Sequence, residues 1–434
     1  MRGAAWAWMA AIVLLGAPAA AAQDAAGDGA AVEEQSLWED LFGPTDWALH
    51  GFYEVRAGYR TRKDPYQKDM SLMETRLQVD IDGYTDWADL KFKGDVYGDL
   101  VDEQGHFDLR EANIFFRPGD AIDVKIGRQI LTWGTGDLIF INDLFPKDWQ
   151  AFFIGRDTEY LKAPSDAAKI SVFSDAVNVD FVYTPQFDSD RHVTGERLSY
   201  WDANVQRLAG QDRIVHTDKP DRWFRDDEFA VRMYKNVDNV ELAVYGYWGY
   251  WKSPAGQSAS GAALFPDLNV YGASVRGTIG EGIGNVEVGY YDSDDDPGGD
   301  DGRIDNSQLR FLVGYTQEMA KDFTAGVQYY IEHMMDYSAY RASLMGGRAR
   351  DQNRHVVTLR LTQLMMNQNL RLSLFTYYSP SDEDAYMRPN LHYKATDNLA
   401  LELGANVFFG DEPHTFFAQF QNDTNIYAAV RYTF

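Results

Sequence analysis

The sequence predicts a transmembrane antiparallel β-barrel of about 18 strands, an all-β fold. Three observations predict it. Apolar and polar residues alternate along almost every extended stretch from Ala48 onward, the polar positions are often charged, and very short connections alternate with long ones. Because successive side chains of a strand point to opposite faces, this pattern gives each strand one lipid face and one face toward water.

The N-terminus has the pattern of a secretory signal peptide. Arg2 supplies a positive charge, and Trp6–Leu15 is apolar but shorter than the roughly 20 residues that a spanning helix needs. Small residues then precede the expected cleavage point. The predicted organisation is a signal peptide over 1–22, a periplasmic N-terminal segment over 23–47, and a barrel over 48–434.

Composition argues against several classes of protein. There is no Cys, which excludes disulfides, a thiol nucleophile and a lipoprotein anchor. The net charge of −26 argues against nucleic-acid binding, which needs a basic face. Aromatic residues make up 14% of a chain whose hydrophobicity is ordinary. A barrel has this mixture because half of each strand can be polar.

One predicted strand breaks the alternation. Phe107 and Leu109 share one parity, whereas Ala112, Ile114 and Phe116 take the other. A β-bulge near Arg110-Glu111 restores a continuous lipid face. A misplaced register is the alternative.

The connections predict the number of strands and their orientation. Short turns rich in Gly, Asp and Asn are expected at 83–86, 117–120, 174–176, 236–239, 281–285, 320–322, 367–369 and 396–398. Longer connections are expected at 61–69, 100–105, 131–166, 186–226, 251–268, 292–304, 335–353, 379–385 and 409–423. Both ends of the barrel lie on the side of the short turns, which is periplasmic in barrels of this kind.

Aromatic pairs recur where strands approach the long connections. They lie at 247–248, 290–291, 329–330, 377–378 and 408–409. We expect them to form the outer aromatic girdle, where amphipathic rings lie at the level of the lipid headgroups. Core aromatics of a β-sandwich are the alternative, but they do not explain the recurrence at one strand end.

The segment at 131–165 is the most unusual connection, because it carries many apolar residues that an exposed loop would not. We expect it to fold inward as a constriction loop. Packing on the barrel rim as a lid and burial in an oligomer interface are the alternatives. The residues assigned to the constriction are Trp133, Asp137, Asp143, Asp148, Arg156, Asp157, Glu159 and Lys162.

A resemblance can be named on this segment and on the last strand. Gly127-Arg128-Gln129, then Thr132-Trp133-Gly134 and an apolar loop, resemble porin-like outer-membrane families related to alginate-export channels. The resemblance implies a passive or facilitated channel of about 18 strands. The lumen here has mixed charge instead of many Arg and Lys, so alginate is not the expected solute. A last strand ending in Phe434 also resembles the closing strand of outer-membrane barrels, which implies that Tyr432 and Phe434 signal to the barrel-assembly machinery.

Inward positions carry charges of both signs. The basic set is Arg310, Arg360, Arg371, Arg388, Lys394 and Arg431, and the acidic set is Asp80, Asp82, Asp89, Asp95 and Asp99. Opposed basic and acidic walls would set a transverse field that orients polar solutes. The alternative is that these charges pair with neighbouring strands and stiffen the wall. We expect both.

No enzyme is predicted. Nucleophile, zinc-protease and phosphate-binding motifs are lacking, and no cofactor is expected. The acidic stretch 292–301 begins like an EF-hand loop, but Arg303 occupies the position that needs Glu, so a specific metal site is not expected. A solvated loop, bridged to lipopolysaccharide by divalent ions, fits better.

The sequence therefore predicts a porin-like channel in the outer membrane of a Gram-negative bacterium, for diffusion or export of a small polar or anionic solute. Its partners are outer-membrane lipid and lipopolysaccharide, the barrel-assembly machinery and the solute, and the oligomeric state is not assigned. Transport of a hydrophobic compound is one alternative. A non-conducting barrel that serves as a structural or docking partner is another.

Overall fold

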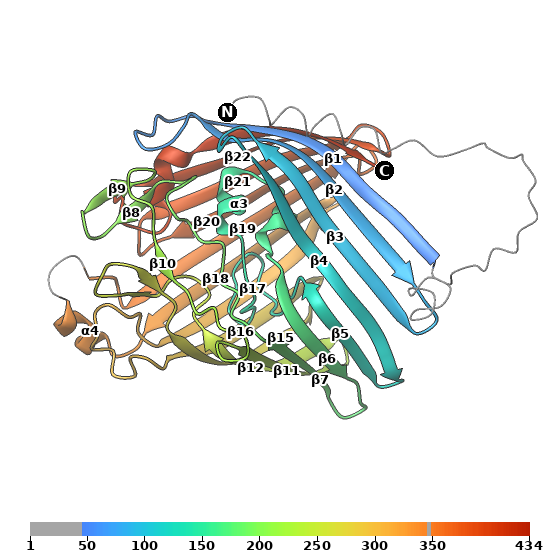
Figure 1. Ribbon diagram of the computed structural model, residues 1–434, viewed down its shortest axis with the longest axis horizontal. Helices are drawn as coiled ribbons and strands as arrows, with labels where there is room; N and C mark the ends of the chain where they lie inside the picture. Colours follow the sequence, from blue (N-terminus) through green and yellow to red (C-terminus); the bar gives the residue numbers. More distant parts are fainter. Residues whose placement is uncertain (1–45, 345–348) are drawn as a thin grey trace, which may run out of the picture.

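The protein, described by a computed structural model over residues 46–344 and 349–434, is a closed barrel of 18 antiparallel strands (Figure 1). The predicted strand number is confirmed. Each barrel strand pairs with its neighbour in the sequence, and β1 pairs with both β2 and β23 to close the ring. The predicted signal peptide and residues 23–45 lie outside the described residues. β1 begins at Asp46, two residues before the predicted start of the barrel.

The elements have the following bounds. The barrel strands are β1 (Asp46–Arg60), β2 (Met70–Tyr84), β3 (Ala88–Asp99), β4 (Gln104–Gly119), β5 (Ile122–Gln129), β6 (Ser165–Val172), β7 (Asn178–Thr184), β11 (Glu228–Val237), β12 (Val240–Tyr250), β15 (Asp267–Ile279), β16 (Gly282–Ser293), β17 (Gln308–Ala320), β18 (Phe323–Met334), β19 (Asn353–Met365), β20 (Leu370–Ser379), β21 (Asp384–Lys394), β22 (Leu399–Gly410) and β23 (Asn425–Thr433). The connections hold β8 (Tyr200–Asp202), β9 (Arg207–Ala209), β10 (Thr217–Asp218), β13 (Gly256–Gln257), β14 (Ala263–Leu264), α3 (Trp149–Ile154), α4 (Tyr337–Ser343), η1 (Thr158–Leu161) and η2 (Ala418–Asp423). Within the described residues, the helices are too short or too polar to cross a membrane.

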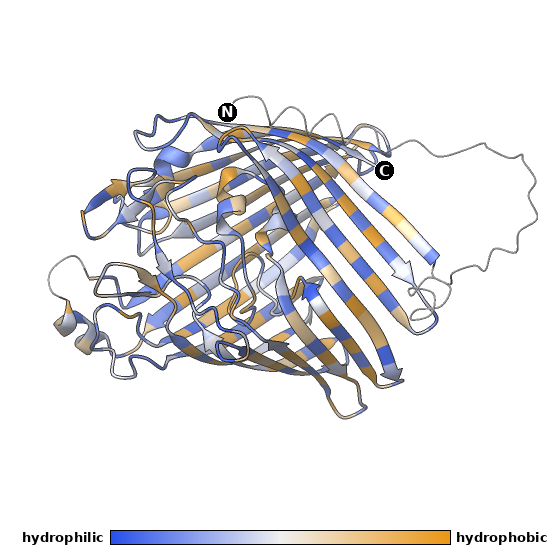
Figure 2. Ribbon diagram, in the orientation of Figure 1, coloured by the Kyte–Doolittle hydropathy of each residue, from blue (hydrophilic) through white to orange (hydrophobic). Residues whose placement is uncertain are grey.

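The two faces of the wall follow the alternation in the sequence. On β1, Tyr53 is 48% exposed whereas its neighbour Glu54 is 4% exposed. The outward rows are mostly apolar and the inward rows mostly polar. Figure 2 shows the resulting alternation of hydrophobic and hydrophilic residues along the strands. Tyr432 and Phe434 belong to the outward row of the last strand and its end. Apolar side chains thus face lipid, and polar ones line the interior.

The predicted break in β4 is a β-bulge. Lys93 of β3 pairs with Glu111 and the next residue, Gly94, pairs with Leu109, so Arg110 has no partner on β3. The extra residue turns the Arg110 side chain toward the interior, where it is 2% exposed. The bulge therefore keeps the lipid face continuous and places a buried guanidinium inside the ring.

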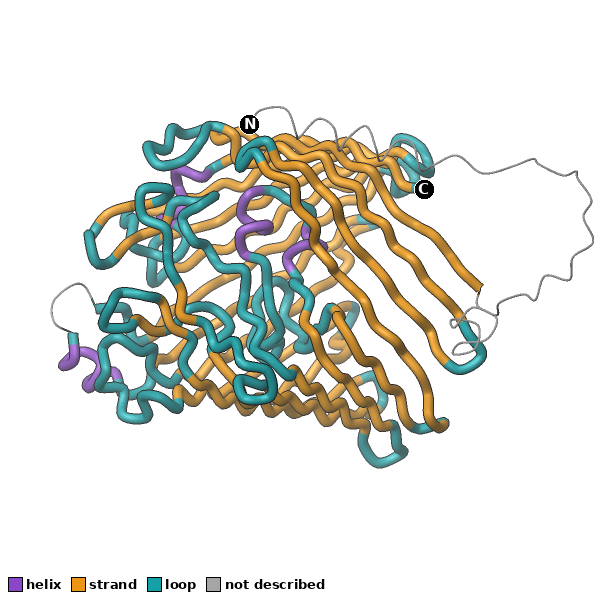
Figure 3. Tube along the Cα trace, viewed as in Figure 1, coloured by secondary structure: helices purple, strands orange, loops and turns teal. Residues whose placement is uncertain are grey.

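The two ends of the barrel differ as predicted. The eight short turns follow β2, β4, β6, β11, β15, β17, β19 and β21, and the longer connections with their small strands and helices lie at the other end (Figures 1 and 3). The first and last strands begin and end on the short-turn side. We call the end with the long connections the outer end.

The two rings of each aromatic pair lie on opposite faces of the wall. The prediction that both rings belong to an outer girdle is therefore wrong for one ring of each pair. Trp248, Tyr290, Tyr329, Tyr378 and Phe409 are exposed on the lipid face, whereas Tyr247, Tyr291, Tyr330, Tyr377 and Phe408 are buried inside. Adjacent residues of a strand point to opposite faces, so one ring of each pair has to point inward. The outward rings suit a girdle, and the inward rings form a second aromatic layer.

Gly51 provides a test of the closing seam. It exchanges main-chain hydrogen bonds with Phe434, and a Cβ there would lie 2.3 Å from the main-chain oxygen of Gln78 and 2.8 Å from the Phe434 ring. We expect Gly51→Ala to lower the free energy of unfolding by ~1–3 kcal/mol because the seam is overpacked. Gly105→Ala on β4 is the control, since nothing lies within 4 Å of its added Cβ. The measurement is the temperature at which the compact form on SDS gels is lost. An equal loss in both variants would contradict the prediction.

Candidate functional site

The connection between β5 and β6 is a 35-residue segment, 130–164, that we call the crossing segment. It contains α3 and η1, and its turns are set by local caps. The Asp148 carboxylate accepts a hydrogen bond from the Ala151 amide at 2.7 Å, and Gly155 ends α3 at φ 100°. The Asp157 carboxylate accepts one from the Glu159 amide at 3.0 Å. Asx caps and a left-handed Gly are the ordinary means of starting and ending such short helices.

One part of the crossing segment is fixed to the wall made by β16, β18 and β19. The Glu287 carboxylate accepts hydrogen bonds from the Thr135 and Gly136 amides, the latter at 2.8 Å. Gln328 accepts from the Asp137 amide at 2.7 Å and donates to the Asp137 carbonyl at 2.8 Å. Polar side chains of the wall thus replace the ladder hydrogen bonds that this irregular backbone lacks.

Asp137 and Leu138 have further partners on this wall. Arg360 on β19 forms an ion pair with Asp137, with Nη2 2.7 Å from Oδ1. The Tyr377 hydroxyl donates to the Leu138 carbonyl at 2.7 Å. Leu138 has φ 58°, a left-handed conformation that costs a branched residue on the order of 1–3 kcal/mol. The surrounding contacts hold this strained turn in place.

Another part of the crossing segment binds the opposite wall. Arg156 donates through Nε to Glu74 of β2 at 2.8 Å, and Arg56 of β1 donates to the Gly155 carbonyl at 3.0 Å. Asp157 forms an ion pair of 3.2 Å with Arg431 of β23. In the ring, β2 lies half-way round from β16. A segment bonded to both lies across the interior of the barrel.

The bulged Arg110 holds the returning end of the crossing segment. Its Nη2 donates to the carbonyls of Glu159 and Lys162 at 3.1 and 2.9 Å, and its guanidinium lies 4.8 Å from the Tyr160 ring. The sequence predicted the position of the bulge but not that its Arg110 would hold the crossing segment. A buried arginine bound to main-chain carbonyls is a strong local anchor, because these hydrogen bonds are charge-assisted.

Aromatic rings complete the attachment. Phe153 of α3 lies 5.4 Å from the Tyr386 ring and 5.6 Å from the Phe408 ring, both on inward positions, and 4.9 Å from Phe420 of η2. The inward aromatic layer therefore packs against the apolar residues of the crossing segment. This explains why the segment is apolar although it lies in a polar lumen.

The assigned constriction residues have different surroundings. Asp137, Arg156 and Asp157 pair with the wall as described above. Trp133 packs 5.0 Å from the Phe145 ring, Glu159 lies 3.8 Å from Arg431, and Lys162 donates to the Thr132 hydroxyl at 2.5 Å.

Two expected path residues are buried, which corrects their assignment. Asp143 and Asp148 are 5% and 2% exposed and do not face water. Asp143 pairs with Lys147 at 3.0 Å, and Asp148 caps α3 and pairs with Arg191 at 3.3 Å. Their carboxylates satisfy groups of the segment itself and, for Asp148, also Arg191 of the connection after β7. Lys147 was missed, although its i,i+4 spacing from Asp143 is a usable signal.

Four of the six predicted basic residues have acidic partners. Arg310 pairs with Glu332 at 3.4 Å, Arg360 with Asp137, Lys394 with Asp397 at 3.1 Å and Arg431 with Glu54 at 2.9 Å. Among the described residues, Arg371 and Arg388 have no ion pair. Arg388 is 8% exposed and lies 3.9 Å from the Phe152 ring.

The predicted acidic wall is largely neutralised by its own neighbours. Asp80 and Asp82 pair with Lys91 at 2.5 and 2.8 Å, Asp95 pairs with Arg76 at 2.7 Å, and Asp99 pairs with Arg197. Within the described chain Asp89 has no ion pair. These contacts follow the expected local pairing, and they leave few free acids to set a field across the pore.

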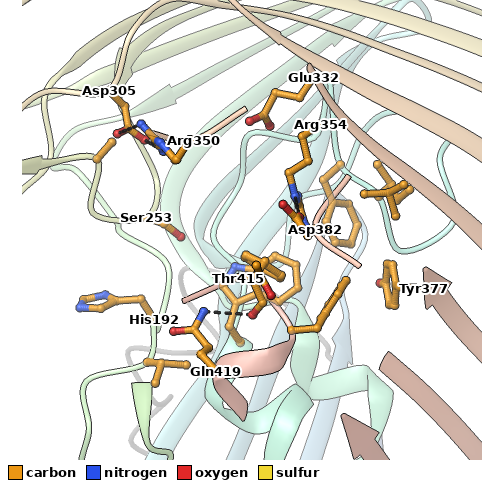
Figure 4. A pocket seen from close by; sticks show the side chains of 18 of the residues that line it. His192, Ser253, Asp305, Glu332, Arg350, Arg354, Tyr377, Asp382, Thr415 and Gln419 are labelled. Atoms are coloured by element: carbon orange, nitrogen blue, oxygen red, sulfur yellow. Dashed lines mark hydrogen bonds and ion pairs between the residues drawn. The ribbon is translucent and has the colours of Figure 1, made fainter. Parts of the chain in front are cut away.

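A cavity of about 1050 Å³ lies on the outer side of the crossing segment. Its floor includes Leu138, Ile139 and Phe140, and its walls come from the long connections and the outer ends of β17, β18, β19 and β20. Figure 4 shows Arg350 beside Asp305 and Arg354 beside Asp382 on one side of this space. A cavity of this size with mixed polar and aromatic lining is typical of small-molecule sites.

The acidic loop around 292–301 binds its own backbone. The Asp296 carboxylate accepts hydrogen bonds from the Asp300 and Asp301 amides at 3.2 and 3.0 Å, and Asp301 pairs with Arg303. No group of three or more acidic or His side chains suited to a metal ion occurs in residues 46–344 and 349–434.

A closed ring of 18 antiparallel strands is the architecture of outer-membrane porins. Three solved structures are similar to it, each at 10% sequence identity: OccAB3 of Acinetobacter baumannii (TM-score 0.54, covering 90% of this chain and 99% of that one), OccK5 (OpdH) of Pseudomonas aeruginosa (0.53, 89% and 98%) and OccD3 (OpdP) of the same organism (0.52, 89% and 91%). At this identity the likeness shows the fold. No protein-family model and no curated protein matches the chain, so the relation to alginate-export channels is not shown.

The anchor at the bulge can be tested by substitution. We expect Arg110→Ala to lower the free energy of unfolding by ~2 kcal/mol, since two main-chain carbonyls lose a charged donor and a buried side chain is removed. Arg117→Ala is the control, because this residue lies on the same strand and its side chain is 66% exposed. Thermal melting followed by circular dichroism measures the difference. Indistinguishable melting of the two variants would count against the anchor.

Proposed function

We propose that the protein is an outer-membrane channel for small polar solutes in a Gram-negative bacterium, and that 131–165 is its constriction. The observation that carries the proposal is the attachment of the crossing segment to opposite walls of an 18-strand ring. A ring of this size is wide enough for a water-filled path, so a fixed segment across it decides which solutes pass. Its proposed partners are lipid, lipopolysaccharide, the barrel-assembly machinery and the solute.

The charge preference of the path is proposed to come from its free arginines. Arg371 is exposed on an inward row of β20, close to the short turn, and has no ion pair within the described residues. Arg360, in contrast, is neutralised by Asp137. An unpaired cation in the lumen favours anions at the inner end of the pore. An anionic solute is therefore one form of the proposal.

A hydrophobic solute is the second candidate, and one observation favours it. Leu138, Ile139 and Phe140 form an apolar floor in a cavity that opens outward. A contiguous apolar patch that lines a cavity often marks a binding site. A docking barrel without conductance, the remaining alternative, predicts a path that stays closed to ions.

Deleting the constriction tests the central claim. We expect replacement of 136–160 by a short Gly-Ser linker to raise single-channel conductance several-fold and to reduce ion selectivity, because the attachments to both walls are lost. The measurement uses the refolded protein in planar bilayers. The Arg117→Ala variant, which leaves the segment intact, should conduct like the unmodified protein. Unchanged conductance after the deletion would contradict the constriction.

Two arginines should differ in their effect on selectivity. We expect Arg371→Gln to shift the reversal potential in a salt gradient away from anion preference, because it removes an unpaired charge. Arg360→Gln should instead raise current noise, since it releases Asp137. The same reversal potential for Arg371→Gln and the unmodified channel would overturn the assignment.

A further inference from the structure

We propose that the outer cavity is a binding site for small organic cations that carry an apolar or aromatic group. The proposal deepens the channel function by naming the solute class collected at the outer end, and it rests on that function for the route onward. It concerns binding in the cavity above the crossing segment. Arg371 and Arg388 do not line this space.

The charge of the lining is the first argument. Among the described residues that line the cavity, nine are Asp or Glu and five are Lys or Arg. Three of the cations, Arg310, Arg350 and Arg354, each have a carboxylate partner that also lines the cavity. The other two are also paired, Lys147 with Asp143 and Lys252 with Glu228. No lining cation among the described residues is therefore left free to attract an anion.

The surplus acids are concentrated at one side of the mouth. Asp351, Glu383 and Asp411 line the cavity and are exposed, and no ion pair is formed by them within the described chain. They come from three successive outer connections, between β18 and β19, β20 and β21, and β22 and β23. A mouth with acids on walls of low dielectric raises the local concentration of cations and repels anions.

His192 lies on the opposite side of the cavity, where Figure 4 shows it across from Arg354 and Asp382. Its Nδ1 lies 3.3 Å from the Asp190 carbonyl and donates to it, and its Nε2 is buried without a hydrogen-bond partner among the described residues. Burial lowers the pKa of His192, which keeps the ring neutral and Nε2 an acceptor. The lining therefore gains no positive charge from this ring.

Aromatic faces supply the second half of the site. Phe416 is 43% exposed at the mouth, and Trp201 and Trp149 also line the cavity. Such faces attract cations: the Arg354 guanidinium lies 4.8 Å from the Phe416 ring, and the Lys147 ammonium lies 4.6 Å from the Phe140 ring. The floor of Leu138, Ile139 and Phe140 then accepts the apolar part of the ligand.

The size of the cavity agrees with this class of ligand. Its volume of about 1050 Å³ is at the upper end of the range of small-molecule sites, roughly 300–1,000 Å³. An amine with one aromatic ring fits with water to spare. Acids at the mouth, an apolar floor and aromatic faces therefore complement a cation with an apolar body.

The test compares three ligands of one shape and different charge. We would titrate 2-phenylethylammonium, 2-phenylethanol and phenylacetate into the folded full-length protein in detergent by calorimetry. We expect the ammonium ion to bind about tenfold more tightly than the other two at low salt, and the preference to shrink as salt is raised. Equal binding of all three, or tighter binding of phenylacetate, would overturn the proposal.

Matched variants locate the site. The triple variant D351N/E383Q/D411N should lose the preference for the ammonium ion and keep the binding of the alcohol. The control D86N/D120N/D175N removes the same charge from exposed positions in the short turns, at the opposite mouth, and should leave binding unchanged. An equal loss of this preference in both variants would show a non-specific effect of net charge and would contradict the proposed site.

Bilayer recordings separate this proposal from the channel function. A conducting barrel with no ligand preference leaves the channel intact and refutes the cation site. A barrel that binds the ammonium ion in calorimetry but never conducts refutes the channel and retains the site. Phe416→Ala should weaken binding of the ammonium ion about threefold without changing the conductance of the channel.

Discussion

The structure depends on one constraint, which is that no main-chain polar group can face lipid without a hydrogen-bond partner. Closure of the ring by β1 and β23 satisfies this constraint for the wall. The interior must meet the same demand differently, because the crossing segment lacks a ladder of its own. Glu287, Gln328 and Arg110 do so by binding its amides and carbonyls. The polar side chains on the inward rows of the strands therefore have two roles. They bind the irregular backbone of the crossing segment, and they form a surface in contact with water.

Charged side chains in the interior pair mainly with close neighbours on the wall. Arg56 donates to both Glu54 and Glu402, and Arg76 pairs with Glu74 and Asp95. Removing one partner of such a buried pair would leave an uncompensated charge, which is far more costly than the net value of the pair. The charged side chains of the wall thus serve mainly to fix the positions of their neighbours. The few that have no ion pair among the described residues, such as Arg371 within the wall and Asp351 at the mouth, are the ones left free to act on solutes.

The sequence predicted the wall almost completely, because period-two alternation and turn chemistry are local properties of the chain. The bulge at Arg110 was located by the same parity rule. The contents of the lumen were less accessible. Whether Asp143 faces water or Lys147, and whether Glu287 lines a pore or binds the amide of Gly136, depends on contacts between residues far apart in the chain. The aromatic pairs recur visibly in the sequence, but that one ring of each pair points inward follows only once the alternation of side chains between the two faces is applied to them.

The last strand has a consequence for assembly. Asn425 donates to the Phe153 carbonyl, 272 residues earlier in the chain, and Arg431 reaches Asp157. Both contacts come from β23, the strand that closes the ring on β1, so the closing strand also binds the crossing segment. Such distant contacts are slow to form, since loop-closure entropy is lost before they contribute. The contacts with β23 are therefore expected to form late, on a crossing segment that Arg110 of β4 and Glu287 of β16 also hold.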